Sequence, residues 1–472
     1  MINRIKINFK LYLFIFNKSL DLNTKIYLLS FLLFSIYLLS SLNWYEQSWQ
    51  YDWEKHKIYF YTFFEKNHIS PYIEAAPWWY NVYGPWVYLI YFIFFLPFFY
   101  MADSLSGSIV YFQDLEHAIE YTIRLGNILL YGAYLYGLVK FSQKINLSFI
   151  CQRYFVLLSF LNPISFQYSL YAIPENLILA LFPYLLIFFL NISNLINDGN
   201  LKKIISLKNL LLLILTIIVA TQKGNGLLLI IFLMLFLCLN LKYNLNNLKV
   251  LIFSLIILYL SINSISYISK LFNGYWWWQH PIVTHWANNP PPGEGFFTNF
   301  DLIKIWSDPF RGSQKNSMLG IWYVDLYGDY WNYWFNNKNL VDNYDLDQNF
   351  ITKYGLLLST ITLILLLYSS YLNILNYFYR RIDFHKFYFS LLWILVFVIS
   401  VLMVKTGFDI RKGTSVNLMY SYFLIPCVFL SIILSFKLQK NLIIKKIHVY
   451  TYIFILIGNL IISLSTPIRI YF

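Results

Sequence analysis

Runs of about twenty apolar residues recur along almost the whole chain, and each is long enough to span a bilayer as an α-helix. The composition agrees: 59% of the residues are apolar and only 12% are charged, against about 25% charged in soluble domains. We therefore predict an all-α polytopic membrane protein with about 11–13 transmembrane helices. The runs lie at 26–44, 85–101, 119–139, 154–173, 176–193, 209–222, 225–241, 250–269, 354–375, 387–404, 418–436 and 448–465.

Positive charge is concentrated in short segments between these runs. Twenty of the 35 Lys and Arg residues lie in 1–26, 140–153, 194–209, 242–249, 376–386 and 437–446. Such charge mostly orients a membrane protein, which predicts that these segments are cytoplasmic. The net charge of +13 is then a topology signal, and it gives no reason to expect a nucleic-acid partner.

Three parts follow from this pattern. Residues 1–269 form an N-terminal transmembrane module with a first outer loop at 45–84, residues 270–353 form a large extracytoplasmic loop, and residues 354–472 form the C-terminal transmembrane helices. From the C-terminus backwards, basic and neutral loops alternate, and 405–417 falls outside.

The alternation fails in one place. Two helices between the outer loop 45–84 and the basic segment 140–153 give the wrong parity. Either the short run 85–101, which contains Pro97, does not cross the membrane, or a further crossing is hidden in the sequence. The hydropathy pattern leaves both open.

Neither a disulfide framework nor a metal site is predicted. Cys151, Cys238 and Cys427 lie in or beside apolar runs, away from the two long loops. His280 and His285 have no third ligand at metal-binding spacing. The basic N-terminus has no cleavage site after its first apolar run, so we expect a retained first helix.

The tryptophans gather on one predicted side of the membrane. Of 15, six lie in 44–86 and eight in 276–334. An aromatic belt explains part of this, because indole favours the bilayer interface, but a belt should mark both interfaces. We expect a belt combined with a platform on which sugar rings stack.

The first outer loop also holds five carboxylates and two histidines between residues 44 and 85. Asp52, Glu54 and His56 alternate, so an extended chain places all three on one face, and a helix places Asp52 and His56 together. A carboxylate here could take a proton from an attacking hydroxyl, and Glu54 or His56 could tune it or help to hold a cation. Solvated loop residues are the other interpretation.

A second basic cluster departs from the positive-inside pattern. Lys405, Arg411 and Lys412 lie on a loop that parity places outside. Such residues are candidates for binding a lipid-linked phosphate at the interface, although Asp409 or anionic headgroups could also pair with them. Tyr420 and Tyr422, at the start of the next helix, could add hydroxyl groups to the same pocket.

The order of motifs resembles the first extracytoplasmic loop of the GT-C glycosyltransferase superfamily. There an acidic residue follows the first helix, then come a Pro-Tyr turn and a Tyr-x-Pro start to the second apolar segment. Asp52, Pro71-Tyr72 and the Tyr-Gly-Pro segment beginning at Tyr83 match these places. The Asp-Glu pair of the protein O-mannosyltransferase branch appears here as Asp52-Trp53-Glu54, and the Pro-Pro before the second segment as Gly-Pro.

Further matches follow over roughly residues 26–335. Arg124 lies where polyprenyl-phosphate-dependent members, including aminoarabinose transferase-like proteins, have an arginine opening a helix. Glu175 lies where many have a second acidic residue, and Lys223 matches a basic position at a helix end. The segment containing Asp329 (Y-G-D-Y-W-N-Y-W) is similar to a motif in the long loop of some members.

The resemblance implies an inverting hexosyltransferase, mannosyltransferase-like, in the cytoplasmic (inner) membrane with its site facing outside. The donor would be a polyprenyl-phosphate-linked sugar and the acceptor a glycan, lipid or protein, amid membrane lipids and without nucleic acid. No cofactor is implied with certainty, and a divalent cation (Mg or Mn) is left open. The implied roles are catalytic for Asp52 and Glu54, donor phosphate binding for Arg124, Lys223, Lys405, Arg411 and Lys412, and substrate binding for His56, Tyr83, Glu175, Asp329 and Tyr420.

Two other functions remain open. A polymerase or ligase of lipid-linked oligosaccharides shares the helix count and the large outer loop, but it should use loop arginines, and 270–353 contains only Arg311. A transporter or flippase should show charges in mid-helix and internal symmetry, and neither is evident in the sequence.

Overall fold

The structure is a computed structural model that describes the membrane-helix bundle and parts of the segments between its helices. The described residues are 21–40, 86–87, 89–91, 93–94, 112–169, 173–198, 207–222, 224–242, 245–273, 295–307, 317–327, 346–399, 422–439 and 441–471. Helices dominate these residues, and no strand occurs among them.

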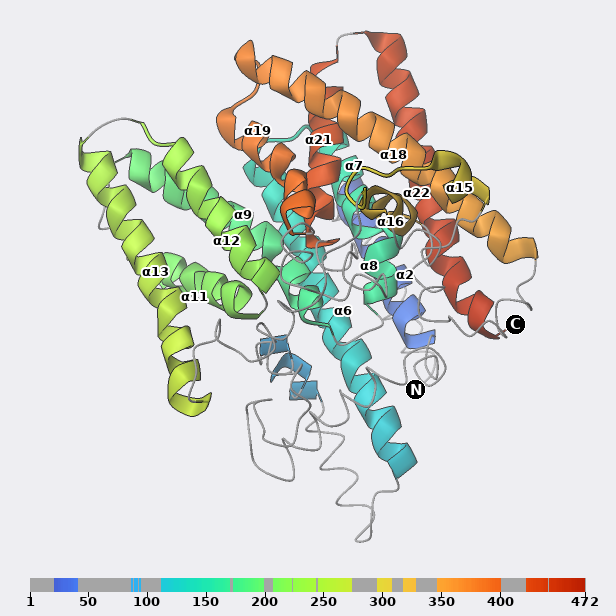
Figure 1. Cartoon of the computed structure of the whole chain (residues 1–472), viewed down its shortest axis with the longest axis horizontal. Helices are drawn as coiled ribbons and strands as arrows, with labels where there is room; N and C mark the ends of the chain where they lie inside the picture. Colours follow the sequence, from blue (N-terminus) through green and yellow to red (C-terminus); the bar gives the residue numbers. More distant parts are fainter. Residues whose placement is uncertain are drawn as a thin grey trace, which may run out of the picture.

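The helices follow the apolar runs, with polar residues extending several of them (Figure 1). Four helices in the described part of the chain contain stretches long and apolar enough to cross a membrane: Leu22–Leu39, Glu175–Asn197, Lys353–Phe378 and Leu442–Ser463. The prediction of an all-α membrane protein is confirmed at this level. The elements are α2 (Leu22–Ser40), α6 (Phe112–Lys144), α7 (Phe149–Phe160), α8 (Pro163–Tyr168), α9 (Pro174–Asn197), α11 (Leu207–Gln222), α12 (Gly224–Leu239), α13 (Leu245–Asn273), α15 (Leu302–Ser307), α16 (Met318–Asp325), α18 (Leu346–Phe378), α19 (Phe384–Leu391), η4 (Leu392–Ile394), η7 (Tyr422–Leu424), α21 (Ile425–Leu438) and α22 (Leu442–Tyr471).

Two helices end in the same left-handed turn. Asn146 after α6 and Arg380 after α18 both have a φ of 54°. In each case the next residue's amide returns to the helix: Leu147 N–H donates to Ser142 O at 3.1 Å, and Arg381 N–H donates to Asn376 O at 2.8 Å. These bonds satisfy carbonyls that a helix end leaves without an intrahelical partner, so the chain can reverse tightly there.

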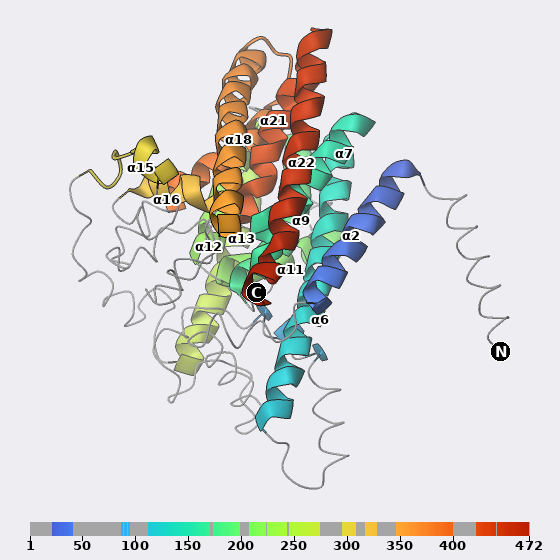
Figure 2. The ribbon, with the colours of Figure 1, turned by 90° about the vertical axis from the view of Figure 1, so that its right-hand side faces the viewer.

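Helices α2 and α6 run antiparallel. Near the start of α2, Asn23 accepts a hydrogen bond from Arg153 of α7, just beyond the end of α6. Further along α2, Phe34 stacks on Tyr131, in the middle of α6. α2 therefore ends, and α6 begins, at the same end of the bundle (Figure 2).

Basic residues surround the turns at the other end of the bundle, which we call the basic end. It carries the α6–α7, α12–α13, α18–α19 and α21–α22 turns (Figure 1). The ammonium group of Lys437, on α21, donates to Asn146 O in the α6–α7 turn at 3.3 Å. The described lysines and arginines in or near these turns are Lys140, Lys144, Arg153, Lys242, Lys249, Arg380, Arg381, Lys386, Lys437, Lys445 and Lys446. We call the end at which α2 ends and α6 begins the distal end.

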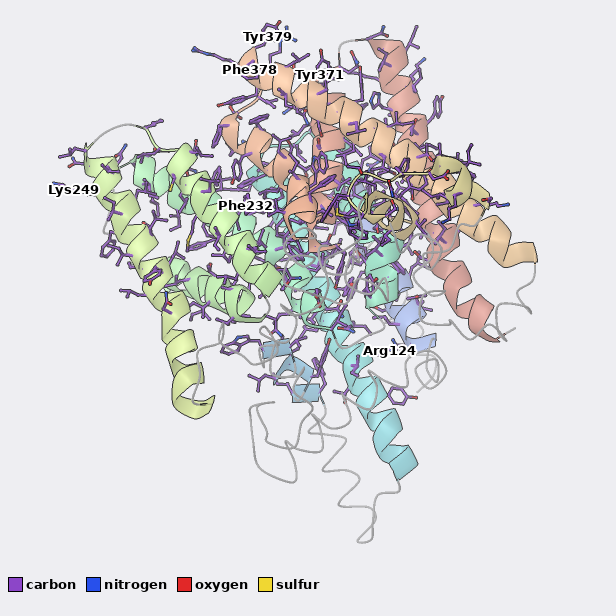
Figure 3. The ribbon with its side chains drawn as sticks, in the orientation of Figure 1. Arg124, Phe232, Lys249, Tyr371, Phe378 and Tyr379 are labelled. Carbon is purple, nitrogen blue, oxygen red and sulfur yellow. The ribbon has the colours of Figure 1, made fainter. Side chains whose placement is uncertain are left out.

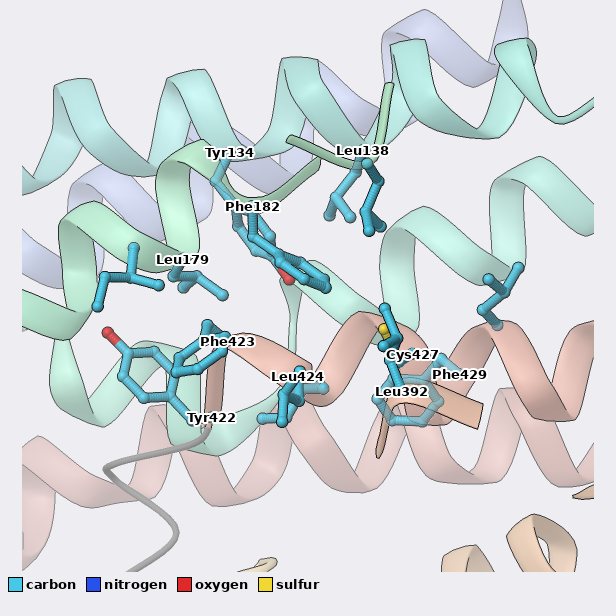
Figure 4. Close-up of a cluster of buried hydrophobic side chains, with 14 of the residues drawn as sticks. Tyr134, Leu138, Leu179, Phe182, Leu392, Tyr422, Phe423, Leu424, Cys427 and Phe429 are labelled. Atoms are coloured by element: carbon cyan, nitrogen blue, oxygen red, sulfur yellow. The ribbon is translucent and has the colours of Figure 1, made fainter. Parts of the chain in front are cut away.

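Aromatic side chains fill the core beneath the distal end. Phe182 of α9 meets Phe423 of η7 with their ring centroids 6.1 Å apart, and Tyr134 of α6 lies beside them (Figure 4). At Gly137 the backbone of α6 comes so close to α9 that an added Cβ would lie 2.8 Å from the ring of Tyr184. Small residues permit such close approach between membrane helices. α6 and α9 are therefore tightly packed next to the polar residues that lie nearer the distal end.

Candidate functional site

Polar side chains are buried together where α6, α8, α9 and η7 meet. Arg124 and Asn127 of α6, together with Glu175 and Asn176 in the first turn of α9, have no exposed surface, and Tyr422 of η7 is 1% exposed. Figure 3 shows Arg124 on the distal half of α6. Ionisable groups inside a membrane bundle are costly and usually functional, so this polar cluster is the candidate site.

Two asparagines connect the elements of the polar cluster. Asn176 Oδ1 accepts hydrogen bonds from the hydroxyl groups of Tyr131, at 3.3 Å, and Tyr422. Asn176 Nδ2 donates to Asn127 Oδ1 at 3.3 Å, and the same Oδ1 accepts from the hydroxyl of Tyr91 at 2.7 Å. The network thus joins α6, α9, η7 and the helical residues around position 91.

The same side chains satisfy backbone carbonyls near the end of α8. Tyr131 donates to Ser165 O at 2.7 Å, Asn127 donates to Ser169 O, and Asn176 donates to Tyr168 O at 3.2 Å. A helix that ends inside a bundle needs partners for its last carbonyls, because unpaired backbone groups are expensive away from water. The polar cluster therefore supplies the partners that let α8 end inside the bundle before α9 begins.

The residues around position 90 dock onto the distal end. Trp86 Nε1 donates to Thr221 Oγ1 at 2.9 Å, and the amide of Val87 donates to Gln222 Oε1 at 3.2 Å. Thr221 and Gln222 are the last residues of α11. The segment that follows the first predicted loop is thus held against both α6 and the tip of the α11–α12 hairpin.

The charged members of the polar cluster lie near tyrosines. Arg124 lies near Tyr37 at the end of α2, and Glu175 lies near Tyr422. A guanidinium offers a rigid fork of donors that suits phosphate and carboxylate groups. Glu175 also lies in the first turn of α9, where the helix dipole favours a negative charge.

The structure brings part of the predicted site together. Glu175 lies near Tyr422, and Arg124 is buried on α6 one turn before Asn127. Among the residues that the structure describes, no group of three His, Cys, Asp or Glu side chains could hold a metal ion. The other predicted site residues lie outside the described residues: Asp52, Glu54, His56, Tyr83, Lys223, Asp329, Lys405, Arg411, Lys412 and Tyr420.

Several members of the network were not predicted. Asn127 and Tyr131 follow Arg124 at the third and seventh positions, a spacing that places all three on one face of a helix. Polar residues at helical spacing inside an apolar run could have identified them. Tyr91 has no such signal, because its partner Asn127 is 36 residues away in the chain.

No protein-family model, curated protein or solved structure matches this chain. The chemistry of the polar cluster and the order of the sequence motifs are therefore the basis for a functional proposal.

Gly126→Ala should loosen the polar cluster. A Cβ at Gly126 would lie 2.3 Å and 2.6 Å from two ring atoms of Tyr91, so the ring must move and its bond to Asn127 should break. Overpacking of this kind costs about 1–3 kcal/mol. We expect a lower midpoint of thermal unfolding in detergent. The control is Gly132→Ala, also in α6, where the nearest atoms are 3.2 Å away on the ring of Phe31. Equal midpoints for the two variants would contradict the docking of Tyr91.

Proposed function

We propose that this protein is a membrane glycosyltransferase that moves a sugar from a polyprenyl-phosphate-linked donor to an acceptor hydroxyl. The observation that carries the proposal is the complete burial of Arg124 and Glu175, toward the end of the bundle at which α2 ends and α6 begins. Asp52 lies between these two helices in the sequence. A buried arginine suits a phosphate whose lipid chain stays in the bilayer.

The proposed orientation places the basic end in the cytoplasm and the distal end outside. Positive-inside orientation supports this, because the basic turns gather at one end. The bundle would then contain about 11–13 transmembrane helices, with the loops 45–84 and 270–353 outside. The site would face the periplasm or the exterior of a cytoplasmic membrane.

Chain connectivity supports the assignment of further residues to this site. Lys223 follows Gln222, which binds Val87 at the distal end. Lys412, the last residue of the basic cluster at 405–412, lies ten positions before Tyr422, which binds Asn176. Both basic regions are thus close in sequence to residues in or beside the polar cluster.

The proposed reaction is a single inverting displacement. The acceptor oxygen forms a bond to the anomeric carbon while the bond from that carbon to the phosphate oxygen breaks. The acceptor proton passes to the Asp52 carboxylate, with Glu54 and His56 adjusting its basicity. Polyprenyl phosphate leaves, and its charge is stabilised by Arg124 together with Lys223, Lys405, Arg411 and Lys412. Aromatic side chains of the outer loops hold the sugar, and the participation of a divalent cation is left open.

Turnover of the donor tests this proposal. The protein in lipid vesicles is given a panel of polyprenyl-phosphate-linked hexoses and candidate acceptors, and released polyprenyl phosphate is measured. Arg124→Gln should lower release about 10²–10³-fold, as for loss of one preorganised charge-stabilising donor. The control is Arg153→Gln at the basic end, which removes a hydrogen bond to Asn23 and a cation–π contact with Phe149. Transport of intact donors without release would instead support a flippase.

A further inference from the structure

Two short helices from the long predicted loop lie alongside the membrane-spanning α18. In both views α15 and α16 are level with the distal half of α18 and do not extend beyond its end (Figures 1 and 2). Residues 346–353, predicted as loop, belong to α18 itself. The described part of this loop is therefore not a domain projecting from the bundle.

Side-chain contacts give the depth of α16. The Tyr323 hydroxyl bonds to Thr360, and Thr362 donates to the hydroxyl of Tyr327 at 3.0 Å. Both threonines belong to the candidate span Lys353–Phe378. Thr360 is about 10 Å along the helix from Lys353 at 1.5 Å per residue. α16 thus contacts α18 inside the apolar span.

A second contact places α16 at the same level. The indole of Trp322 meets the ring of Phe397 edge to face, with centroids 4.3 Å apart. Phe397 lies near the distal end of the apolar helix Phe384–Ile399. α16 is therefore enclosed between two apolar helices, close to the distal membrane surface.

The segment beside α16 presents a largely exposed apolar face. Ile303 is 85% exposed, and the other large exposed hydrophobic residues are Leu302, Phe297, which also contacts Phe296, and Phe300, which also contacts Tyr323. The span of α18 exposes Ile364 (62%) and Leu367. This apolar face lies at the level of α18 and is similar to the surface that a membrane helix presents to lipid.

Several backbone groups of this segment are paired within the protein. Asp301 caps α15, with its carboxylate accepting from the amide of Lys304 at 3.0 Å, and Ile305 N–H donates to Asp301 O. Asn299 N–H donates to Gly295 O at 2.7 Å, and Met318 N–H donates to Phe296 O at 2.9 Å. Internally paired backbone groups can be buried in a leaflet at low cost.

We propose that residues 295–307, held by α16 against α18, lie within the bilayer leaflet at the distal end. Phe297, Phe300, Leu302 and Ile303 contact lipid acyl chains, while the charged ends of Asp301 and Lys304 reach toward the headgroups. The partner of this surface is the membrane. This inference depends neither on the proposed enzymatic function nor on which side of the membrane the distal end faces.

Spin-label accessibility tests this placement in the full protein. Exposed Cys238 is replaced by Ala, and a nitroxide is attached to Ile303→Cys in lipid vesicles. Collision rates with oxygen, which concentrates in lipid, and with a water-soluble nickel chelate are then measured. The references are Ile364→Cys, exposed on the span of α18, and Asp198→Cys, exposed after α9 at the basic end.

The label at 303 should give an oxygen-to-nickel ratio close to that at 364 and several-fold above that at 198. Leu302→Cys should behave in the same way, which guards against a local effect of one substitution. A ratio matching position 198 would place the segment in water and overturn the proposal. Low collision rates with both reagents would indicate a protein contact, such as a second copy, and would also overturn it.

Discussion

Asp52→Asn is expected to abolish sugar transfer while the protein remains folded and inserted. Asparagine keeps the size of the side chain but cannot accept the proton of the attacking hydroxyl. General-base catalysis typically contributes about 10²–10⁴-fold, so the rate of polyprenyl phosphate release in the vesicle assay should fall by that factor. Because the variant removes the base and not the phosphate contacts, donor binding should change little.

Asp198→Asn is the matched control for this prediction. Asp198 is an exposed carboxylate that follows α9 at the basic end, far along that helix from Glu175. Release should be unchanged in this variant. If Asp52→Asn retained full activity, Asp52 would not be the base, whereas equal losses in both variants would point to general damage.

Gly226→Ala is expected to cause the largest loss of folded protein. A Cβ at this position would lie 2.1 Å from the carbonyl oxygen of Val219 and 3.1 Å from its carbonyl carbon. These are backbone atoms, which cannot rotate away as a side chain can, so α11 and α12 would have to separate. The cost should reach or exceed the roughly 1–3 kcal/mol typical of overpacked cores.

The tip of the same hairpin holds Trp86 and Val87 through Thr221 and Gln222. Gly226→Ala should therefore also disturb the distal end, and monodisperse protein recovered after detergent extraction should fall sharply. Gly132→Ala, where the nearest neighbours are ring atoms of Phe31 at 3.2 Å, should be recovered normally. Equal recovery of both variants would mean that α11 and α12 are not packed this closely.

Much of the fold was predictable because apolar runs of membrane length form helices. The run predicted at 176–193 became Pro174–Asn197, and three of its six extra residues are the polar Glu175, Asn194 and Asn197. The run 154–173 was expected to be one helix, but it is divided into α7 and α8 at Asn162-Pro163. Mean hydropathy misses this break, although an Asn-Pro pair is a turn signal in the sequence.

The place of the first described residues of the run 85–101 required tertiary contacts. Its apolar composition suits both a crossing helix and one packed at the end of the bundle. Trp86 and Val87 contact the end of α11, and Tyr91 contacts α6. The depth of α16 is a similar case, because its aromatic and small residues suit a loop as well as a buried helix, and the Tyr323–Thr360 bond has no counterpart in local sequence.

The polar cluster was predictable in part. Arg124 and Glu175 were predicted because they match positions of the GT-C motifs. Asn176 follows Glu175 in the chain, but its link to Tyr422 spans 246 residues, which no local pattern can show. Asp52 and the outer basic residues remain predictions from sequence.

The measurement closest to the central claim is photo-cross-linking with a polyprenyl phosphate that carries a photoreactive group next to the phosphate. It requires neither the sugar nor the acceptor to be known. We predict cross-linked peptides from the distal half of α6, the start of α9 and the region preceding Tyr422, with cross-linking competed by polyprenyl phosphate but not by the uncharged polyprenol. Cross-links confined to the basic end, or competed equally by polyprenol, would contradict a phosphate site at Arg124.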